Sequence, residues 1–279
     1  MAEAVYRDLT RDEVEREYQP ALHVPSIDAV FDEYRDRGLA ARESLRHERH
    51  LYGGHPDEWL WYVHAPTSRA PLVVYLHGGS WSRLSADDGS LLAPGAHLAG
   101  CAFASVNHSL CPHEPLEVLV QQARRAVAHL VEDAARYGHD PRRVIVVGHS
   151  SGAHLAAMVA VHDPRPAAFV LVSGIFDITP IVLTPINDDV RLTTGDAVRL
   201  SPQSLISYSP AECVVAWSMG DTDECRRQAL EWAKRWGEIP GNRSATAVVE
   251  PNRNHFDVVD DLFDANTHLG TAVHDLLSR

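Results

Sequence analysis

A serine in the context of an activated nucleophile lies near the middle of the chain. The pentapeptide Gly148-His149-Ser150-Ser151-Gly152 follows an apolar run at residues 144–147 and precedes an alanine-rich, helix-like stretch. This is the G-x-S-x-G pattern, in which a sharp turn from strand to helix lifts the central hydroxyl clear of the sheet. A Cβ at either flanking glycine is expected to collide with the neighbouring strand or helix. The pattern predicts Ser150 as a covalent nucleophile.

Two later residues stand where a serine nucleophile needs its acid and its base. A serine hydroxyl is weakly nucleophilic, so a base must take its proton and a third group must orient that base. In proteins with this motif the acid and then the histidine follow the serine, each in a loop after a strand. Asp221 directly follows a predicted strand at 213–217, and His255 follows the last predicted strand at 245–249. The chain order predicts Ser150, Asp221 and His255 as a triad.

Other carboxylates compete for the role of the acid. Asp223 is an alternative to Asp221, although it is expected to enter the following helix. Asp177 follows an earlier strand and fits an N-cap or an anchor for a cap. Asp257 neighbours His255 in sequence and has difficulty folding back onto its ring. Because the chain has 17 histidines, position and not residue type selects His255.

A glycine pair supplies candidates for an oxyanion hole, which the tetrahedral intermediate of acyl transfer requires. His77-Gly78-Gly79-Ser80-Trp81 follows a predicted buried strand at 72–76. The backbone N–H groups of Gly78 and Gly79, with that of Ser151, are the expected donors, and losing one donor typically costs about 3 kcal/mol. Ser80, Trp81 and His149 are expected to line the substrate pocket. The alternative is that His-Gly-Gly only forms a loop between two elements, as glycine pairs often do.

The elements around these residues alternate between strand and helix. Helical spacing is seen at 11–18 and 27–37, the second beginning after Ser26, a good N-cap. Further predicted elements are strands at 59–63, 72–76, 101–106, 144–147, 167–173, 213–217 and 245–249, and helices at 115–137, after 150 and at 256–277. Several strands are continuously apolar, which is typical of a parallel sheet covered on both faces. We therefore predict an α/β protein, with a mostly parallel central sheet and helices on both faces.

One connection is too long for a simple loop. The segment at about 175–210 carries Pro180, Pro185 and Pro202, and connections of this length usually have structure of their own. We predict one domain over residues 1–279, in which this insertion and the N-terminal helices, about 1–50, form a small helical cap. The alternative is a surface excursion that covers nothing.

Composition limits the partners. The formal net charge of −13 argues against nucleic acid or an anionic membrane as partner. The four cysteines are scattered, and the first residues contain no apolar leader, so a reduced, cytoplasmic protein is expected. His47 and His50, spaced i and i+3, are candidate metal ligands, but no further ligand pattern accompanies them. No metal and no cofactor is predicted.

Together these motifs resemble the hormone-sensitive-lipase-like branch of the α/β-hydrolase superfamily, and more narrowly the kynurenine formamidases (arylformamidases). The narrower resemblance rests on the segments 18–20, 109–112, 173–177, 185–187, 221–228 and 254–256. The chain departs from the pattern at Ser80, where a tyrosine is expected, and at Cys225, where a phenylalanine is expected. The resemblance implies the α/β-hydrolase fold, the triad Ser150, Asp221 and His255, and oxyanion donors at Gly78, Gly79 and Ser151.

The activity that the resemblance implies is hydrolysis of an aryl formamide such as N-formylkynurenine through an acyl-enzyme. The alternatives are a short-chain carboxylesterase or a deacylase of a secondary-metabolite pathway. A further alternative, from another functional class, is a non-catalytic binding protein with the same fold, because fold alone does not determine function. The expected partner is a small-molecule amide or ester. A homodimer remains open.

Overall fold

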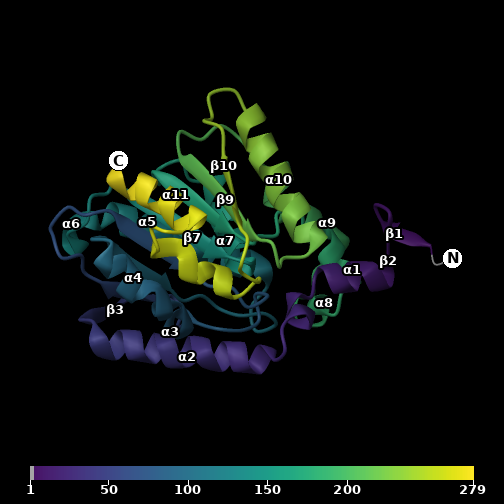
Figure 1. Ribbon diagram of the computed structural model, residues 1–279, viewed down its shortest axis with the longest axis horizontal. Coiled ribbons are helices and arrows are strands. Elements are labelled where there is room, and N and C mark those ends of the chain that lie inside the picture. The colour runs from purple at the N-terminus through teal and green to yellow at the C-terminus, as the bar shows by residue number, and fades with distance from the viewer. Residues whose placement is uncertain (1–2) are drawn as a thin grey trace.

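A central eight-stranded sheet organises the computed structural model, which describes residues 3–279 (Figure 1). Its strand order is β10-β9-β8-β7-β5-β6-β4-β3. The strands are β3 (His47–Leu51), β4 (Trp59–Val63), β5 (Leu72–Leu76), β6 (Ala102–Val106), β7 (Val144–His149), β8 (Ala168–Val172), β9 (Glu212–Ser218) and β10 (Thr246–Glu250). Pairing is parallel from β6 to β10, and antiparallel between β6 and β4 and between β4 and β3. The mostly parallel α/β sheet predicted from the sequence is confirmed.

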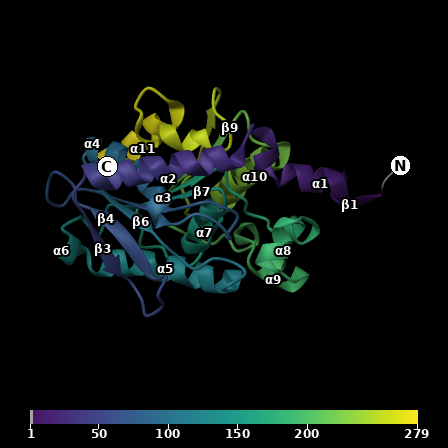
Figure 2. The ribbon, with the colours of Figure 1, turned by 90° about the horizontal axis from the view of Figure 1, so that it is seen from below.

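Each face of the sheet carries its own helical layer (Figure 2). Leu72, Val74 and Leu76 of β5 belong to one core, whereas Val73 and Tyr75 belong to the other, as the two-residue period of a strand requires. The first core includes residues of α5 (Leu116–Glu132), α7 (Ser151–Ala160) and α10 (Asp223–Glu238). The second includes residues of α2 (Ile27–Ser44), α4 (Ala93–Leu98) and α11 (His268–Ser278). Burial of both faces explains why the central strands are continuously apolar.

The N-terminal helices lie at two places on this body. After α1 (Arg11–Glu17) and the 3-10 turn η1 (Pro20–His23), α2 begins at the predicted N-cap Ser26, whose hydroxyl accepts from the N–H of Ala29 at 3.2 Å. α2 packs along α3 (Ala86–Gly89) and η2 (Ser90–Leu92). A short hairpin, β1 (Ala4–Tyr6) and β2 (Leu9–Thr10), precedes them and was not predicted, nor was β3.

The long insertion has secondary structure of its own, as its length predicted. It contains η3 (Thr179–Leu183), α8 (Ile186–Val190), α9 (Thr194–Arg199) and η4 (Pro202–Ser204). α1 packs against η3, the first turn of this insertion. The N-terminal segment and the insertion therefore approach one another although about 160 residues separate them in the chain.

Two predicted helices are each divided in the structure. The segment predicted as one helix at 256–277 forms η5 (Asp257–Phe263) and α11, which is capped by Thr267 accepting from the N–H of Gly270 at 3.0 Å. A Cβ at residue 270 would lie 1.9 Å from the carbonyl oxygen of Asp264, so the tight turn requires this glycine. The helix predicted at 115–137 ends as α5 and continues as α6 (Ala134–Tyr137). Among residues 3–279 we find no helix with the length and apolar character needed to span a bilayer.

Gln228 of α10 joins the loop after β8 to the N-terminal segment. Its side-chain oxygen accepts from the N–H of Phe176 at 2.7 Å and from that of Asp177 at 2.8 Å. Its amide donates to the hydroxyl of Tyr18 at 2.7 Å and to the carbonyl of Asp177 at 3.1 Å. All the capacity of this buried amide is used, so it fixes three segments to one another.

We predict that Gln228→Met lowers the free energy of unfolding by about 2–4 kcal/mol, because buried N–H groups lose their acceptor while the side-chain volume is kept. Urea denaturation followed by far-UV circular dichroism measures the change. Gln121→Met on α5 is the matched control, because the Gln121 side chain only accepts from Arg124. Equal stability of the two variants would contradict the role of Gln228 as a brace.

Candidate active site

Ser150 lies at the junction of β7 and α7, in a strained conformation. Its backbone has φ 54° and ψ −122°, which for a non-glycine residue is unfavourable and must be held by its surroundings. A Cβ at Gly148 would lie 2.2 Å from the carbonyl oxygen of Gly152, and one at Gly152 would lie 2.1 Å from that of Leu76. The collisions expected from the sequence are therefore present, and the two glycines let α7 press against β5.

The structure brings Ser150, His255 and Asp221 into one chain of hydrogen bonds. The Oγ of Ser150 is 3.0 Å from Nε2 of His255, and Nδ1 of His255 is 2.6 Å from Oδ1 of Asp221. An ionised carboxylate only accepts, so Nδ1 carries the proton and Nε2 accepts from the serine hydroxyl. All three residues are buried. This arrangement can remove the hydroxyl proton and return it elsewhere.

Asp221 is held as an anion. Burial by itself would raise its pKa, but the electrostatic interaction with His255 and hydrogen bonds from His255, from the hydroxyl of Ser173 and from the N–H of Ser218 lower the pKa below its ordinary value. The hydroxyl of Ser173 and the N–H of Ser218 both donate to Oδ2, at 2.7 and 2.8 Å. Oδ1 is thus left to His255, and the carboxylate cannot rotate without losing two bonds.

The rival carboxylates lie elsewhere. Asp223 begins α10 and pairs with Arg226. Asp177 accepts from the N–H of Thr179 at 3.0 Å and from the hydroxyl of Tyr6 at 3.1 Å, so it anchors the start of the insertion. Asp257 accepts from the N–H of Asn254 at 2.6 Å. None of these three bonds to the His255 ring in the part of the chain that the structure describes.

Ser173 is a site residue whose role the sequence did not reveal. It follows β8 at the same sheet edge at which Ser150 follows β7, and it too has a positive φ, 48°. A serine directly after a buried strand, at the carboxyl edge of a parallel sheet, was the available signal. Its partner Asp221 follows the next strand, β9, so sheet order explains their contact.

The loop after β5 lies against the nucleophile. A Cβ at Gly78 would lie 3.0 Å from the carbonyl oxygen of His149 and 3.3 Å from the Cβ of Ser150. The Oγ of Ser151 accepts from the N–H of Trp81 at 3.3 Å and ties this loop to the start of α7. Within residues 3–279 the N–H groups of Gly78 and Gly79 donate to no protein acceptor. They are available, with that of Ser151, to a negatively charged oxygen.

Buried histidines fix the walls of the site. His149 donates through Nε2 to the carbonyl of His255 at 2.7 Å, which positions the loop of that residue. His154 of α7 accepts from the indole N–H of Trp81 at 3.2 Å and donates to the carbonyl of Leu200 at 2.8 Å, so Trp81 has one orientation. His77 stacks on His108 with ring centroids 4.3 Å apart.

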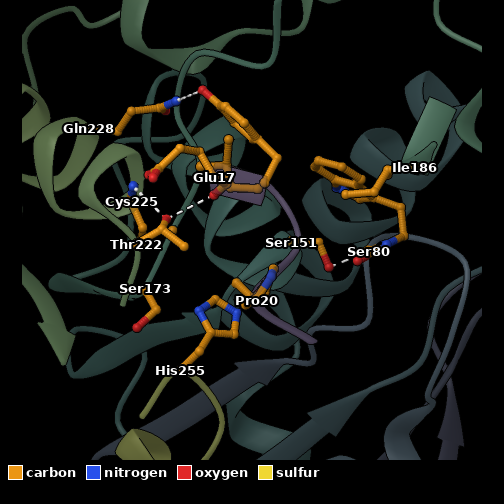
Figure 3. Close-up of a pocket in the computed structure, with 15 residues that line it drawn as sticks. Glu17, Pro20, Ser80, Ser151, Ser173, Ile186, Thr222, Cys225, Gln228 and His255 are labelled. Atoms are coloured by element: carbon orange, nitrogen blue, oxygen red, sulfur yellow. Dashed lines mark hydrogen bonds between the residues drawn. The ribbon is translucent and has the colours of Figure 1, made fainter. Parts of the chain in front are cut away.

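Two cavities of different size meet at Ser150. The smaller, about 30 Å³, is lined by Trp81, Ser173, Thr222 and Cys225 among others (Figure 3). On this scale a single water needs roughly 10–15 Å³, so the chamber accepts a group of about two or three heavy atoms. The larger, about 280 Å³, is lined by residues of η1, α2, α8 and the loop after β5. Ser80 lines both cavities, Trp81 the smaller and His149 the larger, so the three predicted pocket residues all border the cavities at Ser150.

The side chains that could ligate a metal ion make other contacts in the structure. His47 and His50 lie on strand β3, where residues three apart point to opposite faces; His47 packs on Trp61 and His50 on Tyr137. Ligand atoms of Asp221, Cys225 and His255 lie within 4.8 Å of one another. The hydrogen bond between the aspartate and the histidine explains the closeness of two of them.

Four buried imidazoles make the protein sensitive to acid. Burial lowers the pKa of His77 and His154 to about 4 and that of His108 and His149 to about 3, from an ordinary 6.5. All four are neutral in the folded protein at pH 6, whereas the unfolded chain binds protons there. Unfolding therefore takes up protons between pH 6.5 and about 4, and stability falls as the pH falls through that window.

We predict that the free energy of unfolding decreases by up to about 1.4 kcal/mol per pH unit for each of these histidines. Urea denaturation at half-unit steps from pH 7 to 4.5 measures the slope. His154→Gln keeps a donor for the carbonyl of Leu200 and should reduce the number of protons taken up on unfolding by about one, which lowers the slope accordingly. The substitution His268→Gln, at an exposed position, should leave the slope unchanged. A flat profile between pH 6.5 and 4.5 would contradict this explanation.

Comparison with proteins of known structure agrees with the fold. An esterase from Pyrobaculum calidifontis superposes with a TM-score of 0.72 at 19% identity, covering 96% of this chain and 97% of its own. A protein from a Silicibacter species superposes with a TM-score of 0.81 at 23% identity, covering 94% and 98%. Residues 61–170 match the family model described as BD-FAE. Together with the kynurenine formamidase relatives described next, these similarities identify the chain as a hydrolase of the α/β-hydrolase type.

Sequence comparison gives the narrower group. The chain is 32% identical to a kynurenine formamidase from Salmo salar over 95% of both chains. It is 32% identical to one from Danio rerio over 94% of both chains. At this identity and coverage the chain belongs to the kynurenine formamidase family, as its segments around residues 109–112, 173–177 and 221–228 had indicated.

Proposed function

We propose that this protein hydrolyses an aryl formamide such as N-formylkynurenine through an acyl-enzyme on Ser150. The observation that carries the proposal is the continuous hydrogen-bonded chain from Asp221 through His255 to Ser150, which opens on a chamber of about 30 Å³. A formyl group has the size that this chamber admits, and the kynurenine formamidase relatives match nearly the whole chain.

The reaction uses the groups in sequence. Ser150 Oγ attacks the formyl carbon while Nε2 of His255 takes its proton, and Asp221 holds the ring and stabilises the imidazolium. The oxyanion accepts hydrogen bonds from the N–H groups of Gly78, Gly79 and Ser151. His255 then donates the proton to the leaving aryl amine, breaking the C–N bond. Water, deprotonated by the same ring, releases formate and restores the serine hydroxyl.

The larger cavity takes the amine part. At about 280 Å³ it lies at the small end of ligand pockets, which suits a substrate with one aromatic ring better than a long acyl chain. Phe31, Tyr34 and Phe256 contribute aromatic walls, and Pro185 and Ile186 come from the insertion. We infer that η1, α2 and the insertion act together as the cap predicted from the sequence.

A short-chain carboxylesterase is the second candidate. It is supported by the esterases of similar fold and by the same chamber, since an acetyl ester is little larger than a formamide.

We place the protein in the reducing cytoplasm, because its four cysteines are free thiols. Homodimerisation stays a prediction.

We predict that Ser150→Ala lowers kcat on N-formylkynurenine about 10⁵-fold and abolishes labelling by a fluorophosphonate, because the residual groups retain binding but no nucleophile. Ser151→Ala, which keeps the backbone N–H, is the matched control and should still be labelled. Comparison with p-nitrophenyl acetate separates the two candidate functions. Turnover of the ester alone would exclude the formamidase, and a Ser150→Ala protein that is still labelled would exclude the nucleophile.

The size of the small chamber predicts acyl selectivity. Across formyl, acetyl, propionyl and butyryl anilides of one amine, kcat/KM should fall by about 100-fold or more once the acyl group has four heavy atoms, because the walls would have to move. Steady-state kinetics on this series measures the fall. A larger kcat/KM for butyryl than for acetyl would contradict the assignment of this chamber to the acyl group.

A further inference from the structure

The larger cavity contains two formal charges of opposite sign. Its lining residues are mostly apolar or aromatic, and among those in the described chain only Arg83 and Asp189 are charged when histidines are neutral. Arg83 belongs to the loop after β5 that carries Gly78 and Gly79, and Asp189 lies on α8 of the insertion. Two elements that are distant in the sequence thus each contribute one charge to the cavity at Ser150.

Neither charge is used by the protein itself. Within residues 3–279 neither side chain forms an ion pair or a hydrogen bond, so the two are also more than 4.0 Å from one another. Among neighbouring charges, Asp88 accepts from Ser85 and Arg199 pairs with Glu117 and Asp196. Asp188 and Arg191 also form no ion pair within residues 3–279, but unlike the exposed Arg83 and Asp189 they do not line the cavity. Separated, unpaired charges of opposite sign complement a ligand that carries both signs.

We propose that Arg83 and Asp189 form a subsite for a zwitterionic α-amino acid group on the leaving amine. The guanidinium of Arg83 binds the carboxylate, in the planar geometry that favours this pair, and the carboxylate of Asp189 binds the ammonium group. The inference rests on the proposed function and deepens it, because it assigns the residues that would bind the amino acid group of a substrate such as N-formylkynurenine.

Arg83 is also coupled to the oxyanion loop. The carbonyl of Gly79 accepts from the N–H groups of Ser82 and Arg83, at 3.0 and 2.9 Å. A Cβ at Gly79 would lie 2.3 Å from the carbonyl oxygen of Arg83, so the two backbones are in close contact. Binding of a carboxylate by Arg83 therefore restrains the loop whose N–H groups face the reaction, and binding energy from a remote group supports the chemical step.

Asp189 is placed by a local brace. Asn187, on the same short helix, accepts from the N–H of Leu192 at 2.7 Å and donates to its carbonyl at 3.1 Å. These bonds close the turn that ends α8 at Arg191, a residue in the left-handed conformation with φ 58°. The helix that carries Asp189 is thereby held in position without any bond to the aspartate itself.

The test compares two formamides that differ only in the amino acid group. N-formyl-L-kynurenine carries it, and ortho-formamidoacetophenone keeps the ring, the ketone and the formamide without it. Arg83→Met should lower kcat/KM for the first about thirtyfold, through both KM and kcat, and Asp189→Asn about fivefold, chiefly through KM. Both variants should change kcat/KM for the second less than about twofold.

Matched controls separate local charge from general effects. Asp188→Asn removes the adjacent charge on α8, and Arg11→Met removes an exposed arginine of α1; neither residue lines the cavity. Both should leave the kinetics on the two formamides unchanged. Equal losses on both substrates in Arg83→Met and Asp189→Asn would overturn the subsite.

Binding distinguishes this inference from the proposed function. Calorimetry with the Ser150→Ala variant should give tighter binding of L-kynurenine than of ortho-aminoacetophenone. This difference in affinity should vanish when Ser150→Ala is combined with Arg83→Met, and also when it is combined with Asp189→Asn. Failure of the wild type to hydrolyse either formamide would overturn the proposed function. Equal binding of the two amines would overturn the subsite, whichever substrate is hydrolysed.

Discussion

The close contact of α7 with β5 is the constraint on which the site depends. Gly152 lies so near the carbonyl oxygens of Leu76 and His77 that no side chain fits there. Ser150, at the turn into α7, has its strained conformation here, and Gly78 lies so near that a Cβ at that position would be 3.3 Å from the serine Cβ. The serine hydroxyl and the N–H groups of the loop after β5 become neighbours because glycines allow the close approach. Wider spacing would separate the hydroxyl from the N–H groups that stabilise the product of its attack.

The parallel sheet provides the remaining geometry. β7, β8, β9 and β10 are adjacent, and each ends at the same edge. Ser150, Ser173, Asp221 and His255 follow these four strands in order. Ser173 and Asp221 follow adjacent strands, as do Asp221 and His255, whereas the His255 ring reaches Ser150 across the ends of β8 and β9. Asp221 is fixed by bonds from the loop after β8 and from the end of β9, which keeps its second oxygen directed at His255. Neighbouring strand ends thus position the acid, and the loop after β10 brings the His255 ring to the end of β7.

The sequence indicated these parts because they depend on local rules. Apolar runs predicted the bounds of the six strands from β5 to β10 to within two residues at each end. They predicted the bounds of β4 without error. Chain order was enough to select Asp221 and His255 as the residues that meet Ser150. What it did not show depends on packing. β3 is a half-exposed edge strand of polar residues, and it places His47 and His50, considered as metal ligands from their spacing, on opposite faces. The predicted last helix is divided at a turn where Thr267 caps α11 and Gly270 approaches the carbonyl of Asp264, and no periodicity reveals this turn.

Size and charge divide the work of recognition between the two cavities. The chamber of about 30 Å³ is walled by rigid elements, since Trp81 is buried and bonded to His154 and Ser173 is bonded to Asp221. It selects by excluding volume, which a fixed wall does well. The cavity of about 280 Å³ is walled partly by α8 and η1, which belong to the insertion and the N-terminal segment. Those segments reach the body through bonds such as those of Gln228 to Tyr18 and Asp177. Recognition there relies on aromatic surface and unpaired charge, and these adapt to a ligand that a rigid steric wall would reject. In the function that we propose, a single fold therefore combines strict selection of the acyl group with attraction of a particular amine.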